Sequence, residues 1–496
     1  MQQLSGQDAS FVYLDSTKGR THVGSLCIYD QSTAPGGKVR FKEILAHVES
    51  RLDTSPVFRR KLVRVPLDLD NPWWVDDDDF DIEFHVRHIA LPRPGDWRQF
   101  CILIARLHSR PLDMDRPLWE MYVVEGLNNI PWLPKSSFAL FTKMHHAAVD
   151  GHTGQEITAG MHDTSAKPQP KPKRTRWRPE PGPGQAGILV RAGINNIVTP
   201  VRMARHVIGA APGVAQTVLK RLTGNGSDDR LRVPRTRFNG KITPHRVFEG
   251  TRFCLAEISE ARKAVPGATV NDVVLSIAGG ALRRYLEDKD ELPGESLVAF
   301  APINVRRDSE RHTGGNQVSL MRVALRSDVV DPVERLAAVQ RGTSRSKEIT
   351  NAIGARELTD LNKYTPPATL ALAGRLITQA ALLSRTPMVN CVVTNVPGPQ
   401  MPLYLNGAEL VWMGGLGPIV SGMGLIIVLV SYNGELTMTV TSDREIMPDP
   451  SFFTECIDSA WAELKAAVTA SPKKKGRARS RAKASPRRTK ASGRQA

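Results

Sequence analysis

Seven consecutive residues, His145-His146-Ala147-Ala148-Val149-Asp150-Gly151, carry the side chains best suited to chemistry in this chain. The hydroxyl of a neutral alcohol is too weakly acidic to attack a thioester or an ester unaided at neutral pH. A neutral imidazole can take that proton, because its unperturbed pKa lies near 6.5. The motif therefore suits proton abstraction from a hydroxyl group, with His146, the histidine nearer the turn, as the better candidate for the general base.

Three points about the motif stay open: the role of Asp150, a purely structural role for both histidines, and a metal site. Asp150 could orient His146 or could hold the loop through an arginine, and the sequence does not choose between the two. Both histidines could be structural residues at the end of a strand. A metal site made of His145 or His146, Asp150 and His152 is the third alternative, but adjacent strand residues point to opposite faces and no HExxH motif is present. We therefore expect no metal.

The motif must be positioned by elements that the local pattern predicts. Residues 138–144 form an apolar strand that ends at the two histidines, Asp150-Gly151 supplies a turn, and a helix starts at 153–161. Further strands are predicted at 84–89 and 121–124, with a helix at 100–110 between them. The second half of the chain predicts strands at 253–257, 296–302 and 389–394 and a helix at 271–287. A hairpin is predicted from 425–430 and 436–441 across Asn433-Gly434.

These elements combine the two-residue hydrophobic period of strands with the 3.6-residue period of helices, so the predicted fold class is α/β. A chain of 496 residues is too long for one ordinary core. We expect an N-terminal lobe at 1–164, a linker rich in proline and basic residues at 165–187, a basic amphipathic connector at 188–234, a C-terminal lobe at 235–470 and a disordered tail at 471–496. From 181 to 227 the sequence contains no Asp or Glu, which suits contact with an anionic membrane interface or an ordinary pair of interlobe helices.

The net charge of +17 lies largely in the tail, which holds eleven Lys and Arg and no acid, so that 17 − 11 leaves +6 for the other residues. Such a tail suits solubilisation, anionic lipid or phosphate contact. Because it has no aromatic residue to stack on bases, we do not expect nucleic acid as the main partner.

Cysteine usage and hydropathy bear on the compartment. The five cysteines are odd in number and widely spaced, which argues against a disulfide framework and favours a reducing cytoplasm. The first residues lack the pattern of a signal peptide, and the longest apolar stretch, 416–432, is interrupted by glycine and proline. We expect neither export nor a transmembrane anchor.

Six short segments accompany the HHxxxDG motif: LSGQDASF at 4–11, Pro117-Leu118-Trp119, Asn271-Asp272, APINVR at 301–306, Gly315-Asn316 and NVPGP at 395–399. Together they resemble the bacterial wax ester synthase/diacylglycerol acyltransferases, especially the actinobacterial triacylglycerol synthases, within the chloramphenicol acetyltransferase superfamily. The resemblance covers nearly the whole chain except the linker and the tail. It implies two similar α/β lobes with an active-site tunnel between them, entered by acyl-CoA and acceptor from opposite faces.

The resemblance also implies roles for individual residues. His146 would be the general base for direct attack on acyl-CoA without an acyl-enzyme, Asp150 would hold the loop, and Gly151 would let the backbone turn close to the substrates. His145 would have only a supporting role. Asn271 would be an oxyanion donor or a pocket residue, although capping of the following helix is an equally weighted interpretation, and Asp272 a structural hydrogen-bonding residue. The expected pocket residues are Pro117, Leu118, Trp119, Asn395, Pro397 and Gly398, of which the Pro117-Leu118-Trp119 segment suits core packing best.

The expected function is therefore acyl-CoA-dependent diacylglycerol O-acylation to triacylglycerol, with wax ester synthesis as a second activity. Acyl-CoA is a substrate, and no cofactor is expected. The expected location is cytoplasmic, peripheral at the inner membrane or at lipid droplets. Two alternatives stay open: an acyltransferase of the same superfamily acting on another lipid alcohol, and a noncatalytic lipid-surface or nucleoid protein. One departure concerns acceptor preference, because Arg20-Thr21 stands where many relatives have Pro-Met before His22-Val23.

Overall fold

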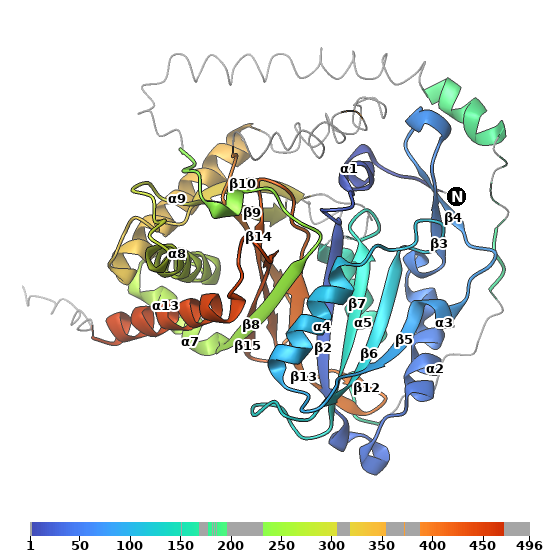
Figure 1. Cartoon of the computed structure of the whole chain (residues 1–496), viewed down its shortest axis with the longest axis horizontal. Coiled ribbons are helices and arrows are strands. Elements are labelled where there is room, and N and C mark those ends of the chain that lie inside the picture. Colours follow the sequence, from blue (N-terminus) through green and yellow to red (C-terminus); the bar gives the residue numbers. More distant parts are fainter. Residues whose placement is uncertain are drawn as a thin grey trace, which may run out of the picture.

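The computed structural model describes residues 2–149, 151–167, 177–180, 182, 184, 186–195, 232–304, 318–353, 372 and 387–470. Two six-stranded sheets and one three-stranded sheet organise the described residues, with helices packed on the large sheets (Figure 1). The expected α/β class with two sheet-rich halves is confirmed.

The N-terminal sheet carries the HHxxxDG motif at the end of a central strand. Its order is β12 (Tyr404–Leu405), β13 (Ala408–Leu416), β2 (His22–Asp30), β7 (Ser137–His145), β6 (Trp119–Leu127) and β5 (Val86–Ala90). Helix α4 (Trp97–Ser109) packs on one face, where Phe100 and Ile104 meet Ile28 and Phe141. Helices α2 (Phe41–Arg51) and α5 (Gly151–Met161) contribute to the core on the other face. Both faces are thus covered, which explains why β6 and β7 are buried over nearly their whole length.

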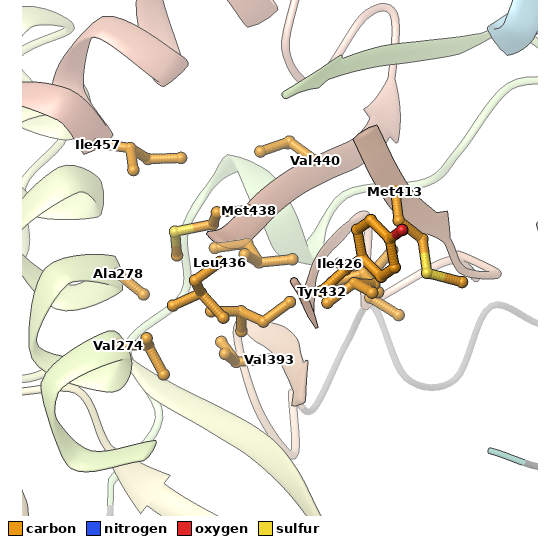
Figure 2. Close-up of a cluster of buried hydrophobic side chains, with 14 of the residues drawn as sticks. Val274, Ala278, Val393, Met413, Ile426, Tyr432, Leu436, Met438, Val440 and Ile457 are labelled. Carbon is orange, nitrogen blue, oxygen red and sulfur yellow. The ribbon is translucent and has the colours of Figure 1, made fainter. Parts of the chain in front are cut away.

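The C-terminal sheet has the order β10 (Val318–Ala324), β9 (Val298–Asn304), β11 (Cys391–Pro397), β14 (Leu425–Tyr432), β15 (Glu435–Asp443) and β8 (Arg246–Cys254). Four helices accompany it: α7 (Leu255–Ala261), α8 (Val270–Asp288), α9 (Pro332–Ile353) and α13 (Pro450–Ala470). Figure 2 shows Val274 and Ala278 of α8 and Ile457 of α13 packed toward Leu436 and Met438 of β15. This apolar layer forms the core of the C-terminal half.

The C-terminal part of the chain contributes two strands to the N-terminal sheet. Strands β12 and β13 lie within the expected C-terminal lobe at 235–470, yet they complete the N-terminal sheet, where β13 pairs antiparallel with β2. A side chain at Gly415 of β13 would place its Cβ 2.7 Å from Cγ1 of Val428 on β14, so glycine allows the two sheets to approach closely. The hydroxyl of Thr439 on β15 donates to the carbonyl oxygen of Gly415 at 2.6 Å. The sheets are therefore joined through β13 and do not follow the division of the sequence into 1–164 and 235–470.

A small sheet flanks the motif. It consists of β1 (Gln2–Gln3), β4 (Trp73–Asp76) and β3 (Arg60–Val63), and α1 (Gly6–Leu14) follows β1 directly. Leu62 and Trp74 on its inner face pack with α1 and with Ala147 of the motif. On its outer face, Trp73 contacts a helix at residues 186–195. The small sheet thus connects the surface of the molecule to the motif through two packed layers.

Most predicted elements match the structure. The strand before the histidines, the helix at 100–110, the helix at 271–287 and the hairpin at 425–441 are confirmed, and Asn433 and Gly434 both have positive φ, as such a tight hairpin turn requires. The other predicted strands and helices are present with shifted bounds, and α5 begins at Gly151, two residues before the predicted start.

Two predicted strands were wrong at one end. In 84–89, Phe84 and His85 belong to a helical turn, α3 (Ile82–His85), because the Asp81 side chain accepts a hydrogen bond from the backbone N–H of Glu83 and caps that turn. In 253–257, the strand ends at Cys254, and α7 starts at Leu255.

Several expectations fall outside the described residues. They are Asp150, Val305, Arg306, Gly315, Asn316, most of the linker and connector, and the tail at 471–496. In the part of the chain that is described, no helix combines the length and the apolar character needed to cross a membrane.

Candidate active site

Strand pairing fixes the two histidines at one edge of the N-terminal sheet. His145 is the last residue of β7 and lies opposite His22 of β2, and its N–H donates to the carbonyl oxygen of Leu118 at 3.0 Å. The N–H of His146 donates to the carbonyl oxygen of Thr21 at 2.9 Å, and the N–H of Ala148 turns back to the carbonyl oxygen of His145 at 2.9 Å. The turn therefore leaves the sheet directly after His145.

The neighbours of the His145 ring fix its orientation and its tautomer. Its Nδ1 accepts the backbone N–H of Ala147 at 3.1 Å, so Nδ1 carries no proton. Its Nε2 lies 3.0 Å from Oγ1 of Thr21, which itself donates to the carbonyl oxygen of Phe11 at 2.9 Å. Thr21 must therefore accept a hydrogen bond from His145 Nε2–H. With no exposed surface and both ring nitrogens engaged, His145 supports the fold of the turn.

The His146 ring is held differently. It stacks on Phe11 of α1 with ring centroids 4.0 Å apart and planes at 6°. His146 is partly exposed, whereas His145 is fully buried. Only one of the two imidazoles can thus meet a substrate, and its plane is set by an aromatic ring from another element.

Thr21 connects His145, His146 and the backbone of α1 through hydrogen bonds. Its carbonyl oxygen receives the His146 N–H, its hydroxyl receives the His145 ring, and the same hydroxyl reaches the backbone of Phe11. Asp15 lies nearby, with Oδ2 3.7 Å from His145 Nε2 and Oδ1 3.6 Å from Nη1 of Arg20. The sequence linked Thr21 only to acceptor preference and assigned no role to Phe11, although Phe11 closes the LSGQDASF segment.

A buried polar layer lies between this edge of the sheet and α4. The Lys143 ammonium has no exposed surface and bonds to the Glu120 carboxylate at 2.8 Å and to the carbonyl oxygen of Leu107 at 3.2 Å. Burial, with the positive charge of Lys143 in second place, holds the pKa of His22 well below its usual value. Burial also lowers the pKa of His108, on α4, to about 3. Both imidazoles are therefore neutral at pH 7.

The segment Pro117-Leu118-Trp119 lies under the motif. Leu118 has no exposed surface, and it packs in the same apolar cluster as Ala147 and α1. Trp119 is also buried, with its Nε1–H donating to the carbonyl oxygen of Phe58 at 3.0 Å and its ring stacked on His85. These side chains pack in the core.

Asn271 and Asp272 lie in the first turn of α8. The N-cap residue is Thr269, so of the two equally weighted interpretations of Asn271 the one in which it caps this helix is wrong. Asp272 completes the capping box, since its Oδ2 accepts the N–H and the hydroxyl of Thr269. Its Oδ1 accepts the hydroxyl of Thr343 on α9 at 2.6 Å. Asp272 therefore ties α8 to α9, while Asn271, its neighbour, is partly exposed.

The segment 395–399 meets the N-terminal half through α5. The side-chain amide of Gln155 donates to the carbonyl oxygen of Pro397 at 2.6 Å. Gly398 donates its N–H to the carbonyl oxygen of Ser431 at 2.8 Å, and a Cβ there would lie 2.4 Å from that oxygen. Asn395 lies on β11, opposite Leu429 of β14. The structure thus joins Pro397 to the helix that follows the motif, a contact that sequence reasoning missed.

Gly151 begins α5, while Asp150 lies outside the described residues. Within the residues that the structure describes, no group of three or more His, Cys, Asp or Glu side chains is arranged to hold a metal ion. All five cysteines are free thiols.

Comparison with known proteins identifies the family of this chain. The wax ester synthase/diacylglycerol acyltransferase catalytic domain matches residues 4–274, and the corresponding C-terminal domain matches residues 314–465. A Mycobacterium tuberculosis protein (strain CDC 1551), named as a diacylglycerol O-acyltransferase, is 33% identical over 453 residues, which cover 90% of this chain and 87% of the relative.

Solved structures agree with this assignment. The wax ester synthase/diacylglycerol acyltransferase of Marinobacter aquaeolei VT8 superposes with a TM-score of 0.67 at 28% identity, covering 95% of this chain and 100% of that one. The trichothecene 15-O-acetyltransferase of Fusarium sporotrichioides shares the fold, with a TM-score of 0.56 at 10% identity over 94% of this chain and 95% of that one. The fold and the matched domains define an acyltransferase, and the chain belongs to the wax ester synthase/diacylglycerol acyltransferase family.

Proposed function

We propose that this chain transfers a fatty acyl group from acyl-CoA to the free hydroxyl of diacylglycerol, with His146 as the general base. The proposal rests on the different surroundings of the two imidazole rings. The neighbours of His145 occupy both of its ring nitrogens, whereas the partly exposed His146 ring is oriented by Phe11. A positioned base of this kind contributes roughly 10²–10⁴ in rate.

The proposed reaction follows from proton and bond balance. His146 takes the proton of the acceptor hydroxyl as its oxygen attacks the thioester carbonyl carbon. The tetrahedral intermediate then collapses, the carbon–sulfur bond breaks, and the proton passes from His146 to the departing coenzyme A sulfur. No acyl-enzyme is required, because the acceptor attacks the thioester directly.

Stabilisation of the developing oxyanion needs a hydrogen-bond donor. We assign this role to the side-chain amide of Asn271. Its position in the first turn of α8 supports the assignment, since Thr269 and Asp272 perform the capping and leave Asn271 with no structural task in that cap. Asp150 is proposed to hold the loop, and Gly151 to let the backbone turn near the substrates.

Both substrates are lipids or carry a lipid chain, so we place the protein in the cytoplasm, at the surface of the inner membrane or of lipid droplets. The acceptor is proposed to approach through a tunnel between the lobes, opposite the acyl-CoA. Long-chain alcohols are a second acceptor class, which is favoured by the matched family domain and by the similarity to the Marinobacter enzyme.

The proposal is tested with purified protein, palmitoyl-CoA and either dioleoylglycerol or hexadecanol. We expect triacylglycerol from the first acceptor, detected by mass spectrometry together with one coenzyme A released per ester. Product from hexadecanol alone would assign wax ester synthesis instead. Absence of thiol release with every alcohol tested would contradict acyl transfer by this chain.

A further inference from the structure

The helix at residues 186–195 has apolar side chains both on the face that packs against the small sheet and on the face toward solvent. Ile188 and Ala192 are buried against Val65 and Trp73 on the outer face of the small sheet. Asn195 anchors the end of the helix through hydrogen bonds from its side-chain amide to Asp70 at 2.7 Å and to Gln3 at 3.3 Å. The inward face of this helix is therefore fully used by the protein itself.

The outward face of the same helix is also apolar. Leu189, Val190 and Ile194 project away from the small sheet, and Val190 and Ile194 are 64% and 56% exposed. Helices on the surface of a globular protein normally present polar residues to solvent, and one that is apolar all round is normally covered. Arg191, whose guanidinium lies over the Trp73 ring at 5.6 Å, is the one charged residue in this helix.

The neighbouring loop between β3 and β4 extends this surface. The loop and the helix, drawn in blue and green in Figure 1, lie side by side, and Val65 and Asp70 of the loop both contact the helix. Leu67 at the tip of the loop is 88% exposed and has φ of 59°, a left-handed conformation that is unfavourable for leucine. Leu69 is exposed as well. The backbone thus presents an aliphatic side chain to solvent at a conformational cost.

We propose that Leu67, Leu69, Leu189, Val190 and Ile194 form one apolar surface that docks on a lipid layer with anionic headgroups. Charge favours a lipid layer over a protein partner, because Arg191, the one charged residue of the described helix, is exposed and basic, and the sequence from 181 to 227 contains no Asp or Glu. Aliphatic side chains inserted at the headgroup boundary beside basic residues are the usual composition of an interfacial helix. The inference rests in part on the proposed function, which requires an acceptor dissolved in lipid.

Docking here would place the lipid two packed layers from the catalytic histidine. The small sheet carries the apolar surface on its outer side, while on its inner side Leu62 and Trp74 pack with α1 and Ala147. Helix α1 in turn supplies Phe11, which stacks on His146. The surface is therefore on the same side of the lobe as the motif.

The test is flotation of the full chain with vesicles of phosphatidylcholine, with and without phosphatidylglycerol. We expect Val190→Gln combined with Ile194→Gln to lower the vesicle partition coefficient about tenfold or more, since two apolar side chains lose their burial. Val330→Gln is the matched control, because Val330 is 71% exposed on another part of the molecule, and it should float like the original chain. Leu67→Asn should lower binding and at the same time raise the melting temperature, since asparagine tolerates the left-handed conformation.

Unchanged flotation of the double variant, or an equal loss in Val330→Gln, would overturn the proposal. A change in oligomeric state with unchanged flotation would assign the surface to a second copy of the chain and would also overturn it. Coenzyme A release with a detergent-dispersed acceptor separates this inference from the proposed function. Variants that lose flotation but keep this release support docking, whereas a chain that floats and releases no thiol contradicts only the proposed acyl transfer.

Discussion

At the scale of single residues, Thr21 positions both histidines of the motif through hydrogen bonds. Its hydroxyl accepts from His145 Nε2–H and donates to the Phe11 carbonyl, and its own carbonyl receives the His146 N–H. A methionine at this position would have no hydroxyl with which to make the two side-chain bonds. In this chain the orientation of the motif therefore depends on a residue outside it.

Replacing Thr21 with valine tests this dependence. Thr21→Val keeps the shape but leaves a buried imidazole N–H unpaired, which costs about 1–3 kcal/mol and lets the turn shift. We expect kcat to fall about tenfold with little change in KM for acyl-CoA, because displacement of a positioned base affects chemistry more than binding. Thr21→Ser, which restores the hydroxyl, should recover most of kcat. Equal kcat for Thr21→Val and the original chain would contradict the positioning role.

Asp272 and Asn271 are neighbours with different expected effects. Asp272→Ala removes the capping box of α8 and the bond from Thr343, so we expect a loss of about 2–4 kcal/mol in the free energy of unfolding. Asn271→Ala should leave the melting temperature within a few degrees while lowering kcat/KM about 10²-fold, because it removes the proposed oxyanion donor. Chemical denaturation and steady-state kinetics on both variants separate the roles. An Asn271→Ala variant with full activity would remove that residue from the site.

At the scale of elements, the crossing of β13 into the N-terminal sheet is the feature that joins the halves. Gly415→Ala would set a Cβ 2.7 Å from Val428 Cγ1, and both strands are buried there. We expect a loss of about 1–3 kcal/mol in the free energy of unfolding, measured by denaturant titration. Val428→Ala in the same chain should recover part of that loss. Gly342→Ala is the control, since a Cβ there meets nothing within 4 Å in α9 and should stabilise the helix.

The sequence predicts local elements and the contiguous motif, because both depend on neighbouring residues. The strand before His145, helix α8 and the hairpin across Asn433 and Gly434 are of this kind. It does not predict which strands pair at long range. The pairing of β13 with β2 joins Glu409 to Asp30, and no local pattern encodes that register.

The same reason explains what was missed in the site. Phe11 and Thr21 precede the motif by more than a hundred residues. The pairing of β2 with β7 brings Thr21 to the motif, and the packing of α1 brings Phe11 to it. Their residue types carry no chemistry that a sequence pattern would single out. The helical turn at Phe84 and His85 escaped prediction because the Asp81 cap overrides the alternating pattern that follows.

At the scale of the whole molecule, buried neutral histidines couple stability to pH. Burial lowers the pKa of His108 to about 3 and that of His162 to about 4, and it also lowers the pKa values of His22 and His85. In the unfolded chain these groups titrate near 6.5. As pH falls below 6.5 the unfolded state gains protons that the folded state does not, so the folded state loses stability.

We therefore expect the melting temperature to fall between pH 7 and pH 5. Each fully neutral buried histidine contributes a loss of about 2 kcal/mol over that interval, with a slope that approaches about 1.4 kcal/mol per pH unit only well below pH 6.5. The His108→Gln variant has one such group fewer and should show a shallower decline, while both proteins behave alike above pH 7.5. Parallel declines in calorimetry would contradict the burial of a neutral His108.

The central claim is that His146, and not His145, moves the proton in acyl transfer. The most direct measurement is the rate of coenzyme A release from palmitoyl-CoA with dioleoylglycerol, for the original chain and for His146→Ala at equal folded concentration. The account predicts a fall in kcat of about 10²-fold or more for His146→Ala, with a melting temperature close to that of the original chain. Release at an undiminished rate by a folded His146→Ala protein would contradict it.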